Sequence, residues 1–309
     1  MTRVATFGNY QSALLDLMSA QTRASEAQQR VSTQKVATDL TGFGRQSETL
    51  TAMKGSQSRI QGFIDTSAAV SARLTTQDLA LGQIKDAVIG VRDALGGAIS
   101  TDSGALLMLE LDSHFQAARG GLNTRHHGGY LFAGASTSTA PVAATSLTEL
   151  AAAPDVASLF SNDTLKTVSR VAEGTTLETG FLADELGTDI LSILRDIQTY
   201  HTTPGLGPLT GKLTEPQKTF LSTQLGRLEQ AGTAVVDKMA RTGSLAKQVE
   251  SITDGHEAQK IALDELLGSR TDADMAEAIT DLQLSQVAIQ ASAQVISQLR
   301  QVSLLNYLN

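Results

Sequence analysis

Apolar side chains recur every seven residues from about Ser47 to Gly96, and this pattern predicts the architecture. One row contains Met53, Ile60, Leu74, Leu81, Val88 and Leu95, with Ser67 as its polar member. A second row runs beside it through Phe63, Val70, Ile84 and Val91. A proline-free heptad pattern of about 50 residues is longer than an ordinary globular helix and is typical of a coiled coil about 75 Å long. We therefore expect a rod-forming helix here.

A second long helix is predicted to begin at Glu215 and Pro216 and to run to Leu267. Its heptad row consists of Leu221, Leu228, Val235 and Val249. A shorter helix is expected from Ser103 to about Thr124, because apolar residues there repeat with a helical period. Between the long helices, residues 136–186 are rich in Ser, Thr, Ala and Gly. Their last part, Leu165 to Phe181, has β-branched residues on both sides of Glu173 and Gly174, which predicts a hairpin and a small β-rich insert.

Both ends of the chain are predicted to form amphipathic helices. One heptad register near the N-terminus contains Tyr10, Leu14, Leu17, Ala24 and Val31. Near the C-terminus, one stripe contains Leu282, Ile289 and Ile296, and another contains Leu284, Ala291, Val295 and Val302. Two stripes on one helix need two partners. The side chains that we assign to an assembly interface are Tyr10, Leu14, Leu17, Val31, Leu282, Ile289, Val295, Ile296, Val302 and Leu305.

Composition narrows the function classes. The 309-residue chain has a formal net charge of −8 and no basic stripe, which argues against nucleic-acid binding. The absence of cysteine removes disulfides, thiolate nucleophiles and cysteine zinc sites. No run of about 18 apolar residues is available to span a membrane. The start, MTRVATFGNYQSALLDL, lacks the apolar core of a Sec signal peptide.

The stretch RHHGGYLFAGASTSTAP, Arg125 to Pro141, is the first candidate for chemistry. His126 and His127 are adjacent, so they point in different directions and do not form the i, i+4 pair that binds metal on a helix; we expect solvated loop histidines. We interpret the stretch as a joint, with Gly128 and Gly129 ending the preceding helix near Thr124. The joint residues are then Gly128, Gly129, Tyr130 and Phe132, with Tyr130, Leu131 and Phe132 anchoring an extended segment.

Two further candidate sites fail on spacing. GLGPLTGKLT, Gly205 to Thr214, lacks the glycine spacing and the Ser or Thr of a phosphate-binding loop. The acids of RTDADMAEAITDLQ are explained by a helix start, because Thr271 and Asp274 have capping-box spacing. No nucleophile, base and oxyanion donor come together, so we expect no catalytic residue, no metal, no cofactor and no enzyme activity.

Several of these stretches are familiar. RTDADMAEAITDLQLSQVAIQASAQVISQLRQVSLLNYL, Arg270 to Leu308, resembles the C-terminal signature of the flagellin superfamily, and QQRVSTQKVATDLTG, Gln28 to Gly42, is similar to the matching N-terminal segment. GGYLFAGASTSTAPV resembles an element of the hook-associated junction branch, where flagellins usually have a phenylalanine-asparagine-glycine motif. VAEGTTLETGFLADELG, Val171 to Gly187, is similar to the strand pair and exit in that branch.

Two departures from the family pattern stand near the N-terminus. The family commonly has Ser/Thr-Gly-Lys where this chain has Thr33, Gln34 and Lys35. It commonly has an Asp-Asp-Pro or Asp-Asp-Ala element where this chain reads TGFGRQSETL. The loop after the first helix is therefore expected to pack differently.

The resemblance implies a mainly α fold: an elongated rod of long antiparallel coiled-coil helices with a small β-rich insert and paired terminal helices. The domains would be a terminal assembly domain (1–45 and 268–309), a rod (46–135 and 187–267) and the insert (136–186). The implied function is that of a structural junction between the hook-side protein and the flagellin filament. The implied partners are further copies of the chain in a ring or tube, the hook-side junction protein, flagellin, and an export chaperone at the C-terminal helix.

The same resemblance implies an extracellular protein of the bacterial flagellum that leaves the cell through the flagellar type III channel. The alternative within the class is a short, divergent flagellin that forms the filament itself. A cytoplasmic coiled-coil scaffold is the alternative from another class, and the Ala/Gln-rich heptads alone would permit it. The β insert and the paired termini count against that alternative.

Overall fold

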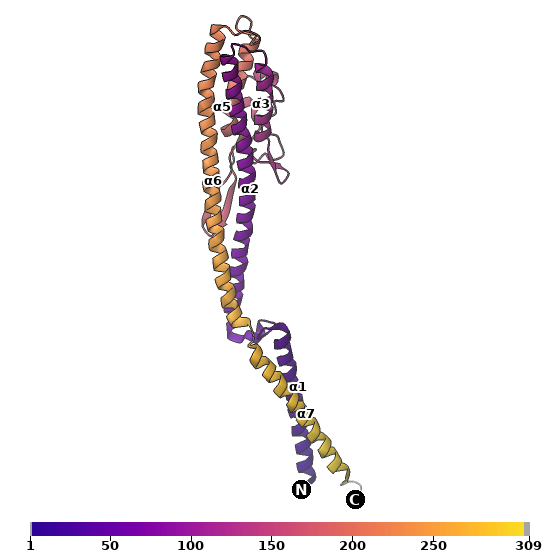
Figure 1. The fold of residues 1–309 in the computed structure, drawn as a ribbon. Coiled ribbons are helices and arrows are strands. Elements are labelled where there is room, and N and C mark those ends of the chain that lie inside the picture. Colours follow the sequence, from indigo (N-terminus) through magenta and orange to yellow (C-terminus); the bar gives the residue numbers. More distant parts are fainter. Residues whose placement is uncertain (1, 306–309) are drawn as a thin grey trace. The chain divides into compact units, whose positions relative to one another are not determined.

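The structure is a computed structural model that describes residues 2–305 of the chain and the side chains of residues 8–300. Long helices dominate it (Figure 1). The helices are α1 (Thr2–Thr33), α2 (Ser47–Ser100), α3 (Leu107–Leu122), α4 (Leu147–Ala152), α5 (Ala183–Thr202), α6 (Glu215–Thr271) and α7 (Met275–Leu305), with 3-10 turns at Thr41–Gln46 and Ala157–Leu159. The strands are β1 (Arg125–His126), β2 (Gly129–Tyr130), β3 (Val168–Ala172) and β4 (Thr175–Glu178). The expected mainly α class, with long helices and little β structure, is confirmed.

The chain divides into two compact units. The terminal unit contains Met1–Arg59 and Ala258–Asn309, and the central unit contains Ile60–Glu257. The predicted boundaries at residues 45 and 268 therefore lie inside the terminal unit. The predicted division into three domains differs from this division into two compact units. The three functional domains stay a prediction.

The central unit is built on the antiparallel pairing of α2 with α6, which lie side by side in Figure 1. The heptad residues Leu74, Leu81 and Leu95 are at most 1% exposed, and Leu221 and Leu228 of α6 are buried as well. α3 and α5 add their apolar faces to the same core. The sequence pattern therefore located both long helices of this unit and the faces that they bury.

The segment 136–186 packs onto this core. Its buried apolar residues Val142, Leu150 and Phe181 belong to the same hydrophobic cluster as the residues of α2, α3, α5 and α6. β3 and β4 form the predicted hairpin with its turn at Glu173 and Gly174, and Gly174 has a positive φ of 77°. The rest of the segment is irregular apart from α4 and a 3-10 turn.

The predicted start of α3 at Ser103 differs from the observed start at Leu107. A turn intervenes, because Asp102 takes a positive φ of 55° and its backbone carbonyl accepts a hydrogen bond from the Leu213 N–H at 3.2 Å. The Asp102 carboxylate also lies 2.7 Å from Lys218 Nζ, and the hydrogen bond from this lysine lowers the pKa of Asp102. The turn between α2 and α3 is thus hydrogen-bonded to the loop that precedes α6 and to the start of α6.

Candidate assembly interface and joint

The terminal helices α1 and α7 pack against each other along their length, and they run in opposite directions (Figure 1). The ion pair between Arg30 and Asp281, with N···O at 3.2 Å, joins the end of α1 to the first half of α7. The inward face of α7 follows a heptad pattern in which Ala278 and Ser285 are buried, and Leu282, Ile289 and Ile296 are half-buried. This face is the first of the two predicted C-terminal stripes.

The most buried side chains of α1 are alanines that are not among the predicted interface residues. Ala13, Ala20 and Ala27 are 8%, 1% and 0% exposed, and they are spaced by seven residues. The predicted residues Tyr10, Leu17 and Val31 lie half-buried on the same face of the helix. The seven-residue spacing of the alanines is visible in the sequence, but alanine marks a buried helix face less clearly than a large apolar residue does.

A second apolar surface on these helices is open. On α1 it consists of Leu14, Leu15 and Met18, which are 38%, 66% and 57% exposed. On α7 it consists of Leu284, Val287 and Val295, which are 63%, 62% and 46% exposed, together with the exposed Ala291. We call the α7 residues the outer row. The side chains of Val302 and Leu305, which were predicted to continue the interface, lie outside the described side chains.

The loop after α1 begins at Gln34, which stands where the resemblance described above would place a glycine. Gln34 takes a left-handed conformation with φ of 57°, and its N–H donates to the Arg30 carbonyl at 2.9 Å. This is the αL ending of a helix, which favours glycine at the residue that follows the helix. Val36 then donates to the Thr271 carbonyl at 2.8 Å, and Ala273 donates to the Gln34 carbonyl at 3.0 Å. The loop therefore packs on the α6–α7 junction.

Replacing Gln34 by glycine should stabilise the terminal unit by about 1 kcal/mol, because a residue with a Cβ pays roughly that penalty in the left-handed region. Gln28→Gly is the matched control, since Gln28 is exposed inside α1. The control should destabilise by about the same amount, through the poor helix propensity of glycine. Hydrogen exchange of the last turns of α1 measures both changes. Slower exchange in the control and faster exchange in Gln34→Gly would contradict the interpretation.

The start of α7 differs in detail from the predicted capping box. The Asp274 carboxylate accepts from the N–H groups of Ala276 and Glu277, at 2.9 and 3.2 Å, so Asp274 itself caps the helix. Thr271 is the last residue of α6. Asp272 pairs with Lys35, and this hydrogen bond lowers the pKa of Asp272. The acids of this stretch thus serve the helix start and the loop contact.

The predicted joint contains a tight β-hairpin. β1 and β2 pair antiparallel, with His126 opposite Gly129, and the two turn residues His127 and Gly128 have positive φ values of 49° and 86°. The expectation that Gly128 and Gly129 end the preceding helix is therefore wrong. α3 ends at Leu122. The side-chain amide of the following residue, Asn123, donates to the Val142 carbonyl at 2.8 Å and accepts from the Val142 N–H at 2.9 Å.

After the hairpin the chain is fixed deep in the central unit. Phe132 and Ala133 are 0% exposed, and Leu131 is 2% exposed. Three successive carbonyls accept hydrogen bonds from three different segments. The Leu131 carbonyl accepts from the Arg73 guanidinium at 3.0 Å, that of Phe132 from the Ala183 N–H at 2.9 Å, and that of Ala133 from the Asp163 N–H at 3.0 Å. Tyr130 is only half-buried, with the Arg125 guanidinium 4.4 Å from its ring centroid.

His126 is not a solvated loop histidine, and that expectation is corrected. Its ring is half-buried, and Nδ1 lies 3.0 Å from the Thr76 hydroxyl on α2. Burial first, and then the neighbouring charges of His127 and Arg73, lower the pKa of His126 below its ordinary value of 6.5. His127 is exposed at the turn.

His126→Gln should remove part of the pH dependence of folding. Because folding lowers this pKa, the unfolded chain binds the proton first as pH falls. The contribution of His126 is therefore complete above about pH 6.5 and is lost as pH falls through the folded pKa. Thermal unfolding between about pH 5 and pH 7 should show a smaller loss of stability on acidification in His126→Gln than in the native chain. His127→Gln should keep most of the loss, since burial of His126 is the larger cause. Equal pH profiles for His126→Gln and the native chain would sink this assignment.

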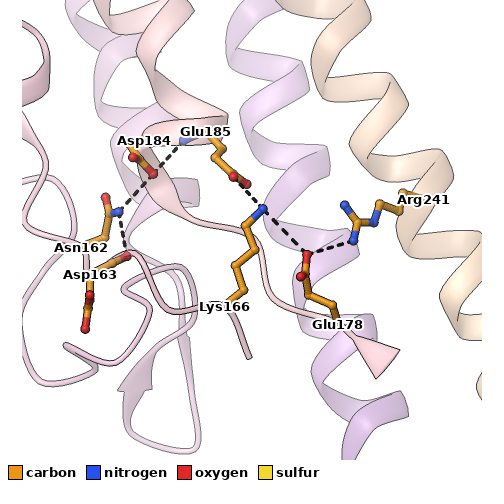
Figure 2. A network of polar contacts seen from close by, with 7 residues as sticks. All are labelled: Asn162, Asp163, Lys166, Glu178, Asp184, Glu185 and Arg241. Atoms are coloured by element: carbon orange, nitrogen blue, oxygen red, sulfur yellow. Dashed lines mark hydrogen bonds and ion pairs between the residues drawn. The ribbon is translucent and has the colours of Figure 1, made fainter. Parts of the chain in front are cut away.

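A polar network connects the hairpin β3–β4 to its surroundings (Figure 2). Glu178 of β4 accepts from Arg241 of α6 at 3.1 Å, and Lys166 reaches Glu185 at 2.7 Å and Glu178 at 3.8 Å. Asn162 donates to Asp184 at the start of α5, at 3.0 Å. The network thus joins the segment before the hairpin, β4, α5 and α6. Its side chains are used in structural pairs rather than being directed at a common ligand.

Other kinds of site find no support in the part of the chain that the structure describes. Within residues 2–305, no group of three or more histidine, aspartate or glutamate side chains is arranged to hold a metal ion. None of the helices in this range has a stretch long and apolar enough for a membrane span. The features that remain are the α1–α7 pair with its open apolar surface and the buried joint.

Part of the chain matches the model of a known protein family. Residues 225–308 match the family model of the bacterial flagellin C-terminal helical region, a span that takes in most of α6 and the described part of α7. Among curated proteins, none matches the chain.

Solved structures show a shared fold. A Vibrio parahaemolyticus protein assigned to the flagellar hook-associated proteins superposes with a TM-score of 0.60 at 17% identity, over 76% of this chain and 99% of the other. FlgL of Bacillus cereus gives 0.56 at 14% identity, and FlgL of Xanthomonas campestris gives 0.57 at 14% identity. Each of these two covers 70% of this chain and 99% of the other.

Proposed function

We propose that this chain is a structural subunit of the bacterial flagellum, the junction protein known as flagellar hook-associated protein 3. Copies of the chain form a ring between the hook-side protein and the flagellin filament. The single observation that carries the proposal is the outer row. It lies on α7, inside the span that matches the flagellin C-terminal region, and it remains exposed after α7 has paired with α1.

The physical reason is that a helix pair with a second apolar face buries that face only by association. Leu284, Val287 and Val295 on α7, with Leu15 and Met18 on α1, expose large apolar side chains on a pair that has already used its inner faces. Exposed apolar patches of this kind mark interaction sites. In a closed ring each copy covers the patch of a neighbour. Residues 1–45 and 268–309 then act as the assembly domain.

Further partners follow from the same role. The hook-side junction protein and flagellin contact the two sides of the ring, and an export chaperone covers the C-terminal helix before assembly. The protein is exported through the flagellar type III channel and acts outside the cell. The sequence stretch GGYLFAGASTSTAPV favours the junction protein over a short flagellin, which is the second candidate.

Antibody labelling of intact flagella distinguishes the candidates. A junction protein gives one labelled band at the hook end of each filament, and a short flagellin gives label along the whole filament. Label confined to the cell interior would overturn both and would favour the coiled-coil scaffold. A deletion strain adds a second test, because loss of a junction protein should leave hooks without filaments while unassembled flagellin appears in the medium.

A further inference from the structure

The seam between α2 and α6 in the central unit contains one buried polar pair. The second heptad row of α2 passes through position 77, and the row of α6 passes through position 242. Gln77 is 0% exposed and Thr242 is 2% exposed. The Gln77 amide N–H donates to the Thr242 hydroxyl at 3.0 Å. On α2, the neighbouring members of the row, Val70 and Ile84, are apolar.

Two contacts establish the register of the seam. Gln77 faces Thr242, and two heptads nearer the start of α2 the ring of Phe63 stacks on that of His256, with centroids 5.4 Å apart. Each step of seven residues back along α2 is therefore matched by a step of seven forward along α6. Between these contacts, Val70 and Val249 belong to one buried cluster. The two heptad rows thus meet residue for residue in an antiparallel arrangement.

Heptad repeats do not by themselves select one register. If α6 slipped by seven residues, most apolar layers would be replaced by other apolar layers, because Val235, Val249 and Leu228 are similar in kind. The polar pair would not survive. Gln77 would then face Val235 or Val249, and Thr242 would face Val70 or Ile84. The Gln77 Oε1 is already buried without a partner, so a slip would leave the whole amide unpaired, and a buried unpaired polar group is costly.

We infer that the Gln77–Thr242 hydrogen bond is a register lock, which selects one antiparallel alignment of α2 and α6 among those that the apolar heptads allow. Selecting the register is the best attested use of a buried polar residue in a coiled coil. The lock keeps Phe63 level with His256, whose Nε2–H donates to the Val171 carbonyl of β3 at 3.0 Å. A slip of one heptad would displace α6 by about 10 Å and would take this contact away from the hairpin.

The absence of cysteine from the chain permits a direct test. The in-register reporter is Val70→Cys/Val249→Cys. The two slipped reporters are Phe63→Cys/Val249→Cys and Val91→Cys/Val235→Cys, which can form a disulfide only after a one-heptad shift in one direction or the other. Each reporter is placed in the full-length chain, which is unfolded and refolded in oxidising glutathione. Disulfides are counted by non-reducing electrophoresis and peptide mass spectrometry.

With Gln77 and Thr242 intact, only the in-register reporter should form its disulfide. In Gln77→Leu/Thr242→Val, slipped disulfides should increase about tenfold or more. The matched control is Gln83→Leu/Thr233→Val, the same replacements at exposed positions on the same helices, and it should give no slipped disulfide. The reversed pair Gln77→Thr/Thr242→Gln restores a hydrogen bond across the seam and should reduce slipping again.

The single variant Thr242→Val covers the case in which the double variant does not fold. It leaves the Gln77 amide unpaired in every register, so slipped disulfides should rise here too. If the double and single variants both refold with the in-register disulfide alone, the rest of the core sets the register and the inference is wrong. Slipped disulfides in the native background would overturn it as well.

Discussion

Phe132→Ala should lower the free energy of unfolding of the central unit by about 3–5 kcal/mol, the usual cost of deleting a fully buried phenylalanine. The ring is 0% exposed, and the backbone around it is held by Arg73, Ala183 and Asp163. Because these hydrogen bonds come from α2, from α5 and from the segment before the β3–β4 hairpin, the site cannot easily collapse into the space that the ring leaves. We therefore expect the upper part of the range.

Thermal and denaturant unfolding of the purified chain measures this cost. Tyr130→Ala is the comparison on the same segment: its ring is half-buried and contacts Arg125 at the surface. We expect a clearly smaller loss for this variant. A Phe132→Ala protein whose free energy of unfolding is within about 1 kcal/mol of that of the native chain, or one more stable than Tyr130→Ala, would show that the segment does not anchor the β1–β2 hairpin.

The long helices could be predicted from the sequence because their apolar rows keep heptad spacing over many turns. Ser67 is a polar member of its row, and positions 77 and 242 are gaps in the apolar pattern of theirs. They are buried and paired with each other. Apolar periodicity alone does not identify a buried polar residue at a heptad position, although its position in the row can be read from the sequence.

Small residues caused the second omission. Alanine is common on every face of a helix, so Ala13, Ala20 and Ala27 gave a weaker indication than leucine did, yet they form the most buried row of α1. The large residue Leu14, a predicted interface residue, is 38% exposed and lies outside this seam. Close packing of two helices favours small side chains at the contact, and the large residues beside them are left for other partners.

The joint shows a limit of another kind. A glycine pair after a helix is compatible with a helix end and with a hairpin turn, and only the pairing of Arg125 with Tyr130 decides between them. The hydrogen-bond partner of His126 is Thr76, which is 50 residues away in the sequence. Contacts of this range have no local signature, so the partner of this histidine could not be predicted.

Leu284→Asp/Val287→Asp should abolish incorporation of the protein into flagella while leaving the α1–α7 pair intact. Both side chains belong to the outer row and are more than 60% exposed, so the monomer does not depend on them. In an assembled ring the two carboxylates would be buried in an apolar contact without partners, which costs several kcal/mol for each subunit interface. A change at Ile289 would be less informative, because this residue lies on the inner face and would disturb the pairing with α1 as well.

The matched control is Gln283→Asp/Gln290→Asp, which adds the same two charges to exposed positions on a different face of α7. Circular dichroism and size-exclusion chromatography should give equal helix content and equal size for both purified variants. Motility and antibody labelling of flagella should then separate them, with the control assembled and the outer-row variant absent. If the outer-row variant is incorporated as well as the native chain, this surface is not the contact between subunits, and the exposed residues Leu14, Leu15 and Met18 of α1 become the next surface to test.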